Sequence, residues 1–226
     1  MPARERIFAR IRHNLGRGPL PEDAANVLKA RIEGHAPHTI PKRTDISRKK
    51  QVDLFAAKAE ALAATVARVS SLDEVPEAVR DYLAAHNLST KIKMSPDKAL
   101  DDLPFDRTPM LEITRGAAEP SDEVSLTPAF SGIAETGTLC MASGPETPST
   151  LNFLPENHMV VIRASQIAGT LEESWARLRE TYGAGNLPRT VNFISGPSRT
   201  GDIEQTLIMG AHGPRRLHIF IVEDEE

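Results

Sequence analysis

The alternation of apolar and polar positions along the chain predicts an α/β fold. Apolar residues at helical spacing indicate helices over residues 48–69, 75–86 and 170–182. Short apolar runs between turn residues indicate strands at 91–94, 111–114, 124–128, 138–142, 158–163, 191–194 and 217–222. Strands that alternate with helices are joined by right-handed crossovers, so we expect a mostly parallel sheet that is covered on both faces.

The N-terminal region has a different pattern. Apolar residues recur every four positions over residues 4–15 and predict an amphipathic helix. Residues 16–41 carry several proline breakers, which indicate an extended arm with a short helix near 23–32. We therefore expect residues 1–45 to form a basic helical and extended arm, and residues 46–226 to form the α/β domain.

The charge is divided unevenly between these parts. Residues 1–50 hold 12 Lys and Arg against 5 Asp and Glu, whereas the remainder holds 15 against 26. A basic arm on an acidic body is suited to docking on an acidic partner. The arm lacks aromatic residues interleaved with its charges and any nucleic-acid-binding motif, so we expect no nucleic acid partner.

The single cysteine, Cys140, restricts the chemistry of the chain. It excludes an internal disulfide, and an iron–sulfur cluster usually requires four thiolates. Any electrons must then be carried by a partner chain or a diffusible cofactor. No His-x-x-x-His or Cys-x-x-Cys pair predicts a metal site. No apolar run approaches the ~20 residues of a membrane span, and no signal peptide is recognisable, so we expect a cytoplasmic protein.

The segment 196–205, Gly-Pro-Ser-Arg-Thr-Gly-Asp-Ile-Glu-Gln, is the strongest candidate for a binding site. It follows the apolar run 191–194 and precedes an amphipathic run, which predicts a strand, a loop and then a helix over 202–209. The start of such a helix presents free N–H groups and a positive dipole end to an anion. The predicted ligand-binding residues of this segment are Gly196, Ser198, Arg199, Thr200 and Asp202.

Arg199 has two interpretations in this segment. It can pair with Asp202, three positions further on, and rigidify the loop. A guanidinium beside exposed N–H groups can also grip a carboxylate in a bidentate manner.

A second candidate is the sequence Glu135-Thr136-Gly137-Thr138, which predicts a tight turn before the strand 138–142. Glu135 can act as a general base, a nucleophile or an acceptor for a substrate hydroxyl. Its structural alternatives are to cap a helix or to pair with an arginine. Thr136, Gly137 and Thr138 are predicted to contact the substrate.

Two histidines lie in further candidate loops. His212, between Gly210 and Pro214, is predicted either as a general acid or base or as a contact of the last carbonyls of the preceding helix. His158, at the start of the strand 158–163, is interpreted either as a structural, hydrogen-bonded histidine or as a residue that orients substrate.

These segments together resemble the lactate-utilization protein C family, whose domain is called LUD. The resemblance rests on residues 134–138, 154–158, 194–205 and 210–214, and on the opening helix with Leu15-Gly16-Arg17. It implies a three-layer α/β/α sandwich with a mostly parallel sheet, similar to ribose-5-phosphate isomerase, glucosamine-6-phosphate deaminase and the CoA transferases. It also implies that two iron–sulfur proteins act with the chain in growth on L-lactate, through oxidation to pyruvate.

The resulting hypothesis is a subunit of an L-lactate utilization system that binds a small carboxylate or a coupling ligand. Glu135 or His212 would handle a proton. The chain itself would hold no cofactor, because the iron–sulfur clusters are expected on the partner chains. Two alternatives stay open: a non-catalytic assembly factor that docks the iron–sulfur subunits, and a stand-alone enzyme acting on a sugar phosphate or a CoA ester. Whether the chain forms a homo-oligomer is also open.

Overall fold

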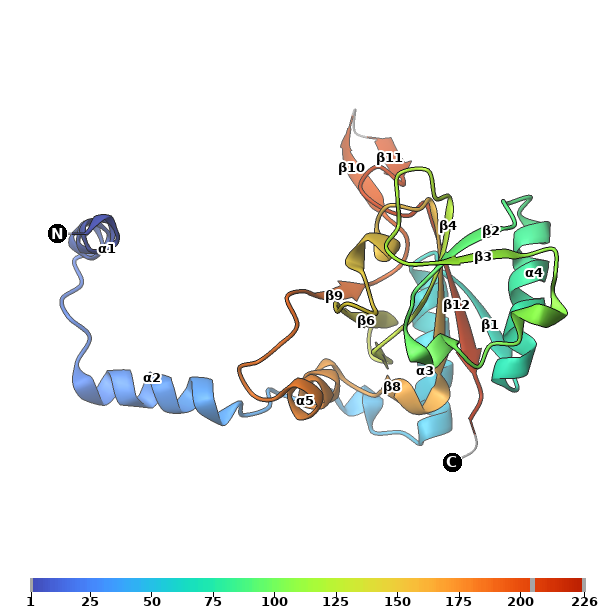
Figure 1. The fold of residues 1–226 in the computed structure, drawn as a ribbon. Helices are drawn as coiled ribbons and strands as arrows, with labels where there is room; N and C mark the ends of the chain where they lie inside the picture. Colours follow the sequence, from blue (N-terminus) through green and yellow to red (C-terminus); the bar gives the residue numbers. More distant parts are fainter. Residues whose placement is uncertain (1, 204–205, 225–226) are drawn as a thin grey trace. The chain divides into compact units, whose positions relative to one another are not determined.

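The structure, a computed structural model, describes residues 2–203 and 206–224 (Figure 1). They divide into two compact units, one within Met1–Thr39 and the other within Ile40–Glu226. The first unit holds helices α1 (Ala3–Asn14) and α2 (Glu22–Gly34), in which no residue is buried. Both predicted N-terminal helices are thereby confirmed. In the described part of the chain, no helix is long and apolar enough to cross a membrane.

The second unit is built on a six-stranded sheet. Its strands, in spatial order, are β1 (Thr65–Val69), β12 (Arg216–Val222), β7 (Asn157–Arg163), β4 (Val124–Pro128), β2 (Lys91–Met94) and β3 (Glu112–Arg115). Every neighbouring pair is parallel. The predicted mixed α/β fold with a mostly parallel central sheet is confirmed. The near-continuous apolar runs of β7 and β12 fit central strands, which are buried on both faces.

Alternate residues of these strands point to opposite faces of the sheet, and a helix covers each face. On one face, α4 (Val75–Ala85) packs its Val79 and Leu83 in a core with Phe220. On the other face, α3 (Arg48–Ala61) packs Phe55 in a core with Ile219. Consecutive residues of a strand point to opposite faces, so Ile219 packs in one core and its neighbour Phe220 in the other.

A second, four-stranded sheet shares the α3 face. Its spatial order is β8 (Ile167–Ala168), β5 (Ser131–Ile133), β6 (Thr138–Ala142) and β9 (Val191–Ile194). The β5–β6 and β6–β9 pairs are antiparallel. Helix α5 (Leu171–Tyr182) contacts this sheet, and the Ser131 and Ser174 hydroxyls lie 2.7 Å apart.

The assignment of 138–142 and 191–194 to the parallel sheet was therefore wrong. A short turn returns the chain from β5 to β6, and a tight turn joins antiparallel neighbours rather than making a crossover.

Two helix predictions also need correction. The predicted helix 48–69 ends at Ala61, because Ala63 adopts a positive φ of 69° and the chain then extends into β1. The predicted helix 202–209 is a hairpin of β10 (Arg199–Ile203) and β11 (Thr206–Met209). Alternating β-branched residues favour strands over a helix in this segment. The helix N-terminus expected to bind an anion is thus absent from the described part of residues 199–209.

Short 3₁₀ turns complete the second unit. They are η1 (Lys42–Thr44), η2 (Leu72–Glu74), η3 (Lys98–Leu100), η4 (Phe105–Arg107), η5 (Ser149–Asn152) and η6 (Ala164–Gln166).

Candidate functional site

A cavity of about 220 Å³ lies where the loop after β9 meets the loop before β12. We call it the loop cavity. Its walls come from residues 193–198 and 212–214, with further residues from the beginnings of β7 and β12. The structure brings Gly196, Ser198 and His212 of the predicted site residues together around this space.

The two loops are the two ends of the β10–β11 hairpin, and hydrogen bonds hold them together. The Ser198 N–H donates to the Pro214 carbonyl at 2.8 Å, and the Gly210 N–H donates to the Ser198 carbonyl at 2.9 Å. The His212 N–H donates to the Ser198 hydroxyl oxygen at 3.3 Å. Ser198 is therefore a structural junction as well as part of the cavity wall.

Gly196 and Gly137 both pack against the C-terminal end of α3. Gly196 has a φ of 84°, and a Cβ there would lie closer than 3.0 Å to the Leu62 carbonyl oxygen. Gly137 has a φ of 65°, and a Cβ there would meet the Ala59 backbone nitrogen equally closely. Both positions require glycine because of backbone conformation and close approach. This packing fixes the two predicted turns on one helix end.

His158 is the buried polar group of the loop cavity. Its side chain is 1% exposed, and its Nε2 lies 2.8 Å from the Thr127 hydroxyl oxygen. Its Nδ1 has no hydrogen-bond partner among the residues that the structure describes. Burial lowers the pKa of His158 to about 3, so the ring is neutral near pH 7. A buried ring nitrogen without a partner is costly, and this atom is also shielded from solvent.

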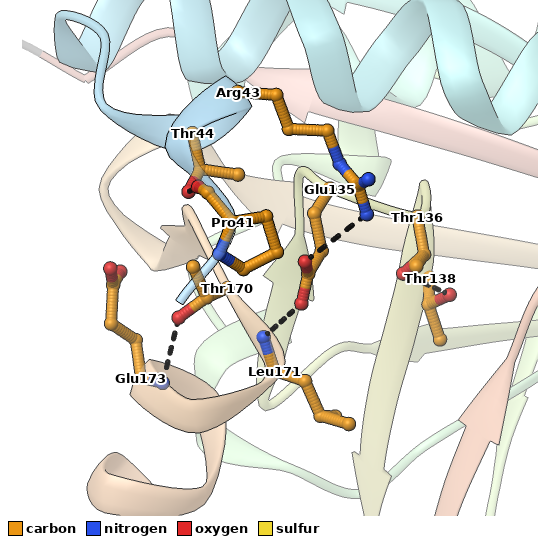
Figure 2. A network of polar contacts seen from close by, with 9 residues as sticks. All are labelled: Pro41, Arg43, Thr44, Glu135, Thr136, Thr138, Thr170, Leu171 and Glu173. Atoms are coloured by element: carbon orange, nitrogen blue, oxygen red, sulfur yellow. Dashed lines mark hydrogen bonds and ion pairs between the residues drawn. The ribbon is translucent and has the colours of Figure 1, made fainter. Parts of the chain in front are cut away.

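The predicted turn 135–138 lies at the start of α5 (Figure 2). The Leu171 N–H donates to Glu135 Oε1 at 2.8 Å, and Arg43 Nη2 lies 3.4 Å from Glu135 Oε2. Thr170 caps the same helix by accepting from the Glu173 N–H at 3.2 Å. Both structural alternatives for Glu135, helix capping and an arginine pair, are thus observed. A catalytic role for Glu135 stays a prediction.

A chain of hydroxyl groups links this turn to the loop cavity. The Thr136 and Thr138 hydroxyl oxygens are 2.8 Å apart, and those of Thr138 and Ser195 are 2.6 Å apart. Ser195 lines the loop cavity. The structure therefore connects the two predicted regions through Ser195, which the sequence analysis did not select. Its position directly before Gly196 in the candidate segment could have identified Ser195 as a site residue.

The remaining predicted residues lie on β10. Arg199 is opposite Met209 and Thr200 is opposite Ile208 in the hairpin register. Neither is among the described residues that line the loop cavity. The Asp202 side chain lies outside the described part, so its pairing with Arg199 stays a prediction.

For His212, the alternative of contacting the last carbonyls of a helix is wrong, because the preceding element is the strand β11. His212 is exposed and lines the loop cavity, and its acid or base role stays a prediction.

Cys140 is buried, and burial raises the pKa of its thiol. In residues 2–203 and 206–224, no group of three or more His, Cys, Asp or Glu is arranged to hold a metal ion.

The chain is a mixed α/β domain protein, with a parallel central sheet flanked by helices and a second, smaller sheet. A family model, the LUD domain, matches residues 52–222. The chain belongs to the LUD domain family.

Relatives carry the name Lactate utilization protein C. The protein from Shouchella clausii is 32% identical over 103 residues, which cover 46% of this chain and 45% of that protein. The protein from a Geobacillus species is 37% identical over 93 residues, which cover 41% and 39% respectively. The chain thus matches less than half the length of these relatives.

The fold is also similar to a crystal structure of a DUF162 family protein from Deinococcus radiodurans. The TM-score is 0.56 at 22% sequence identity, and the match covers 78% of this chain and 99% of that chain. At this identity the similarity establishes the shared fold.

Proposed function

We propose that the chain is a component of an L-lactate utilization system that binds a small hydroxy or oxo acid in the loop cavity. The names of the two relatives support the process. The observation that carries ligand binding is the neutral, buried His158, whose Nδ1 has no partner among the described residues.

The size of the loop cavity agrees with a three-carbon acid. Its volume of about 220 Å³ equals the space of roughly seven water molecules at ~30 Å³ each. A CoA ester is much larger than this space. The size of the loop cavity therefore favours lactate or pyruvate over a CoA ester.

His158 offers a hydrogen bond suited to the oxygen on C2 of such an acid. If the Thr127 hydroxyl donates to Nε2, Nδ1 carries the proton, and it can donate to a ligand oxygen once the cavity wall shifts to expose this buried atom. In the other tautomer, Nδ1 accepts from a hydroxyl group. The hydroxyl of lactate can use either tautomer, whereas the carbonyl of pyruvate needs the first. The hydroxyl groups of Ser195 and Ser198 are available in the same wall for the carboxylate.

In this proposal, separate iron–sulfur proteins accept the two electrons that leave when lactate becomes pyruvate, and the two protons lost from C2 and its hydroxyl group pass to solvent. The chain itself has one cysteine, Cys140, which is buried. The proposed contribution of the chain is to hold the acid in the loop cavity. His212, which lines this cavity, would pass a proton to solvent.

The proposal is tested by thermal unfolding and calorimetry with L-lactate and pyruvate, with the uncharged lactamide as ligand control. We expect both acids to raise the unfolding temperature and to bind at least tenfold more weakly to His158→Asn. His218→Asn is the matched control, because His218 is also buried, with a ring nitrogen that has no partner among the described residues, but lies on the α4 face. Equal losses in both variants, or no binding to the wild type, would refute the proposal.

The same assay examines Arg199. An acid-induced stabilisation that persists in Arg199→Ala rules out a direct carboxylate grip by this side chain.

A second function, docking of an acidic partner, is favoured by the surface of the first unit. No residue of α1 or α2 is buried, and Ile7, at 59%, is among their exposed apolar side chains. Residues 1–39 hold 7 Lys and Arg against 4 Asp and Glu. Exposed apolar groups rimmed by basic ones suit an acidic surface on an iron–sulfur partner.

This docking function predicts that Ile7→Ser with Ile11→Ser abolishes co-purification with the iron–sulfur proteins and leaves acid binding unchanged. Arg6→Gln with Arg10→Gln measures the electrostatic share and should weaken the complex more at low salt than at high salt. A complex that survives deletion of residues 2–39 would exclude the arm as the docking element.

A further inference from the structure

A larger cavity, of about 760 Å³, lies at the carboxyl ends of β2 and β4. We call it the strand-end cavity. Ser95 and Asp97 follow β2, and Pro128 and Phe130 lie at and beyond the end of β4. Further walls come from the end of β6, the loop 143–148 that follows it, Tyr182 at the end of α5, and residues 186–188. Among the predicted site residues whose side chains the structure describes, none lines this space.

The chain topology explains why a crevice forms there. β2 and β4 are neighbours in the sheet. The next strand of this sheet after β2 in the chain is β3, which lies on the far side of β2. The next one after β4 is β7, which lies on the far side of β4. The segment after β2 packs Leu100 and Leu103 into the core on the α4 face. The segment after β4 packs Leu139 and Met141 into the core on the α3 face. Adjacent parallel strands whose connections leave toward opposite faces produce a ligand crevice at their carboxyl ends.

The charges in the strand-end cavity select against anions. Asp97 and Glu146 contribute two carboxylates. Among the described residues of its wall, none is Lys, Arg or His. A phosphate group placed there would meet like charges and lack any cation to bind it.

The same walls offer an aromatic surface and hydrogen-bonding groups. The rings of Phe130 and Tyr182 lie with their centroids 5.9 Å apart and their planes tilted by 36°. Burial and the nearby Asp97 carboxylate raise the pKa of Tyr182, so its phenol keeps its proton and can donate. The carboxylates of Asp97 and Glu146 can accept hydrogen bonds from hydroxyl or amino groups.

We propose that the strand-end cavity binds an uncharged, nucleoside-like molecule, which is a flat ring carrying hydroxyl or amino donors. The ring lies against Phe130 and Tyr182, and the donors bind the carboxylates of Asp97 and Glu146. The volume falls within the range of about 300–1,000 Å³ that is usual for organic ligands. This ligand would occupy a different cavity from the acid that is proposed to bind in the loop cavity.

The test uses two matched pairs of probes, adenosine with AMP and riboflavin with FMN, in calorimetric or fluorescence titrations of the full chain. We expect at least one uncharged member to bind with a Kd below 1 mM and its phosphorylated partner at least tenfold more weakly. Asp97→Asn combined with Glu146→Gln should reduce that difference to less than threefold. Asn at position 97 can still accept from the Ala99 N–H, as Asp97 does at 2.8 Å.

Removal of the aromatic surface provides a second arm. Phe130→Leu should weaken binding of the uncharged probe at least fivefold, whereas Phe8→Leu in α1 should leave it unchanged. If Phe130→Leu lowers the unfolding temperature strongly, Tyr182→Leu replaces it. The proposal is overturned if neither uncharged probe binds, if the phosphorylated member binds as tightly, or if both aromatic variants bind like the wild type.

Discussion

Replacement of Gly196 by alanine tests whether this glycine is fixed by packing against α3. Its φ of 84° lies in the left-handed region, which costs a non-glycine residue about 1–2 kcal/mol. The new Cβ would also press on the Leu62 carbonyl oxygen, and overpacking of this kind costs about 1–3 kcal/mol. We therefore expect Gly196→Ala to lower the free energy of unfolding by roughly 2–5 kcal/mol.

Thermal and urea unfolding measure this effect. For a chain of this size, each 1 kcal/mol shifts the unfolding temperature by about 2–4 °C, so the expected decrease is at least ~4 °C. Gly201→Ala is the matched control in the same Gly-Pro-Ser-Arg-Thr-Gly segment, because no atom of the described residues lies within 4 Å of a Cβ there. Equal unfolding temperatures for the two variants would show that the close approach to Leu62 does not exist.

Two further predictions concern buried and capping groups. Burial lowers the pKa of His158 to about 3 and that of His218 to about 4, below the ~6.5 of an unfolded histidine. Between pH 6.5 and about 4 the unfolded state therefore binds more protons, and stability should fall as the pH falls, by about 2 kcal/mol per histidine at pH 5. The matching Asn variants should each flatten this slope in urea titrations, and an unchanged slope would contradict the burial of the neutral rings. Glu135→Ala should lower the free energy of unfolding by about 1 kcal/mol, because the Leu171 N–H loses its acceptor. Arg43→Ala should lower it by less than ~0.5 kcal/mol, because the Arg43 side chain is 58% exposed. Equal losses for the two variants in unfolding experiments would contradict this prediction.

The central sheet could be predicted because its strands are recognisable without knowledge of their partners. The run 158–163 is apolar at nearly every position, which only a strand buried on both faces requires. The second sheet could not be predicted in the same way. Whether 138–142 pairs with a preceding strand or crosses to a distant one depends on partner choice, which the apolar pattern does not encode.

The hairpin after Arg199 shows where periodicity is ambiguous. The run 203–209 has apolar residues compatible with a helical stripe, but the β-branched residues Thr200, Ile203 and Ile208 favour extended backbone. Short runs of this kind fit both periods, and the tertiary environment decides between them.

The candidate site was partly predictable for a similar reason. The loops at 196–198 and 212–214 could be selected from their glycines and polar residues, and the structure brings them together around the loop cavity. The importance of His158 could not be judged from sequence, because the lack of a partner for its Nδ1 among the described residues depends on which neighbours surround it. The strand-end cavity depends on strand order, which emerges only from the three-dimensional structure.

The two proposed ligands would be neighbours, and this leads to a measurable consequence. Thr127 lines the strand-end cavity and His158 lines the loop cavity, and their side chains are hydrogen-bonded at 2.8 Å. The buried Asn152 lines both spaces.

A ligand in the loop cavity that fixes the tautomer of His158 also decides whether His158 Nε2 or the Thr127 hydroxyl is the donor in the hydrogen bond between them. Binding in either cavity should therefore change the affinity of the other by the same factor, because coupling free energies are reciprocal. Thr127→Val removes this bond and should bring the factor to one, so coupling that persists in Thr127→Val would assign it to another contact, such as Asn152.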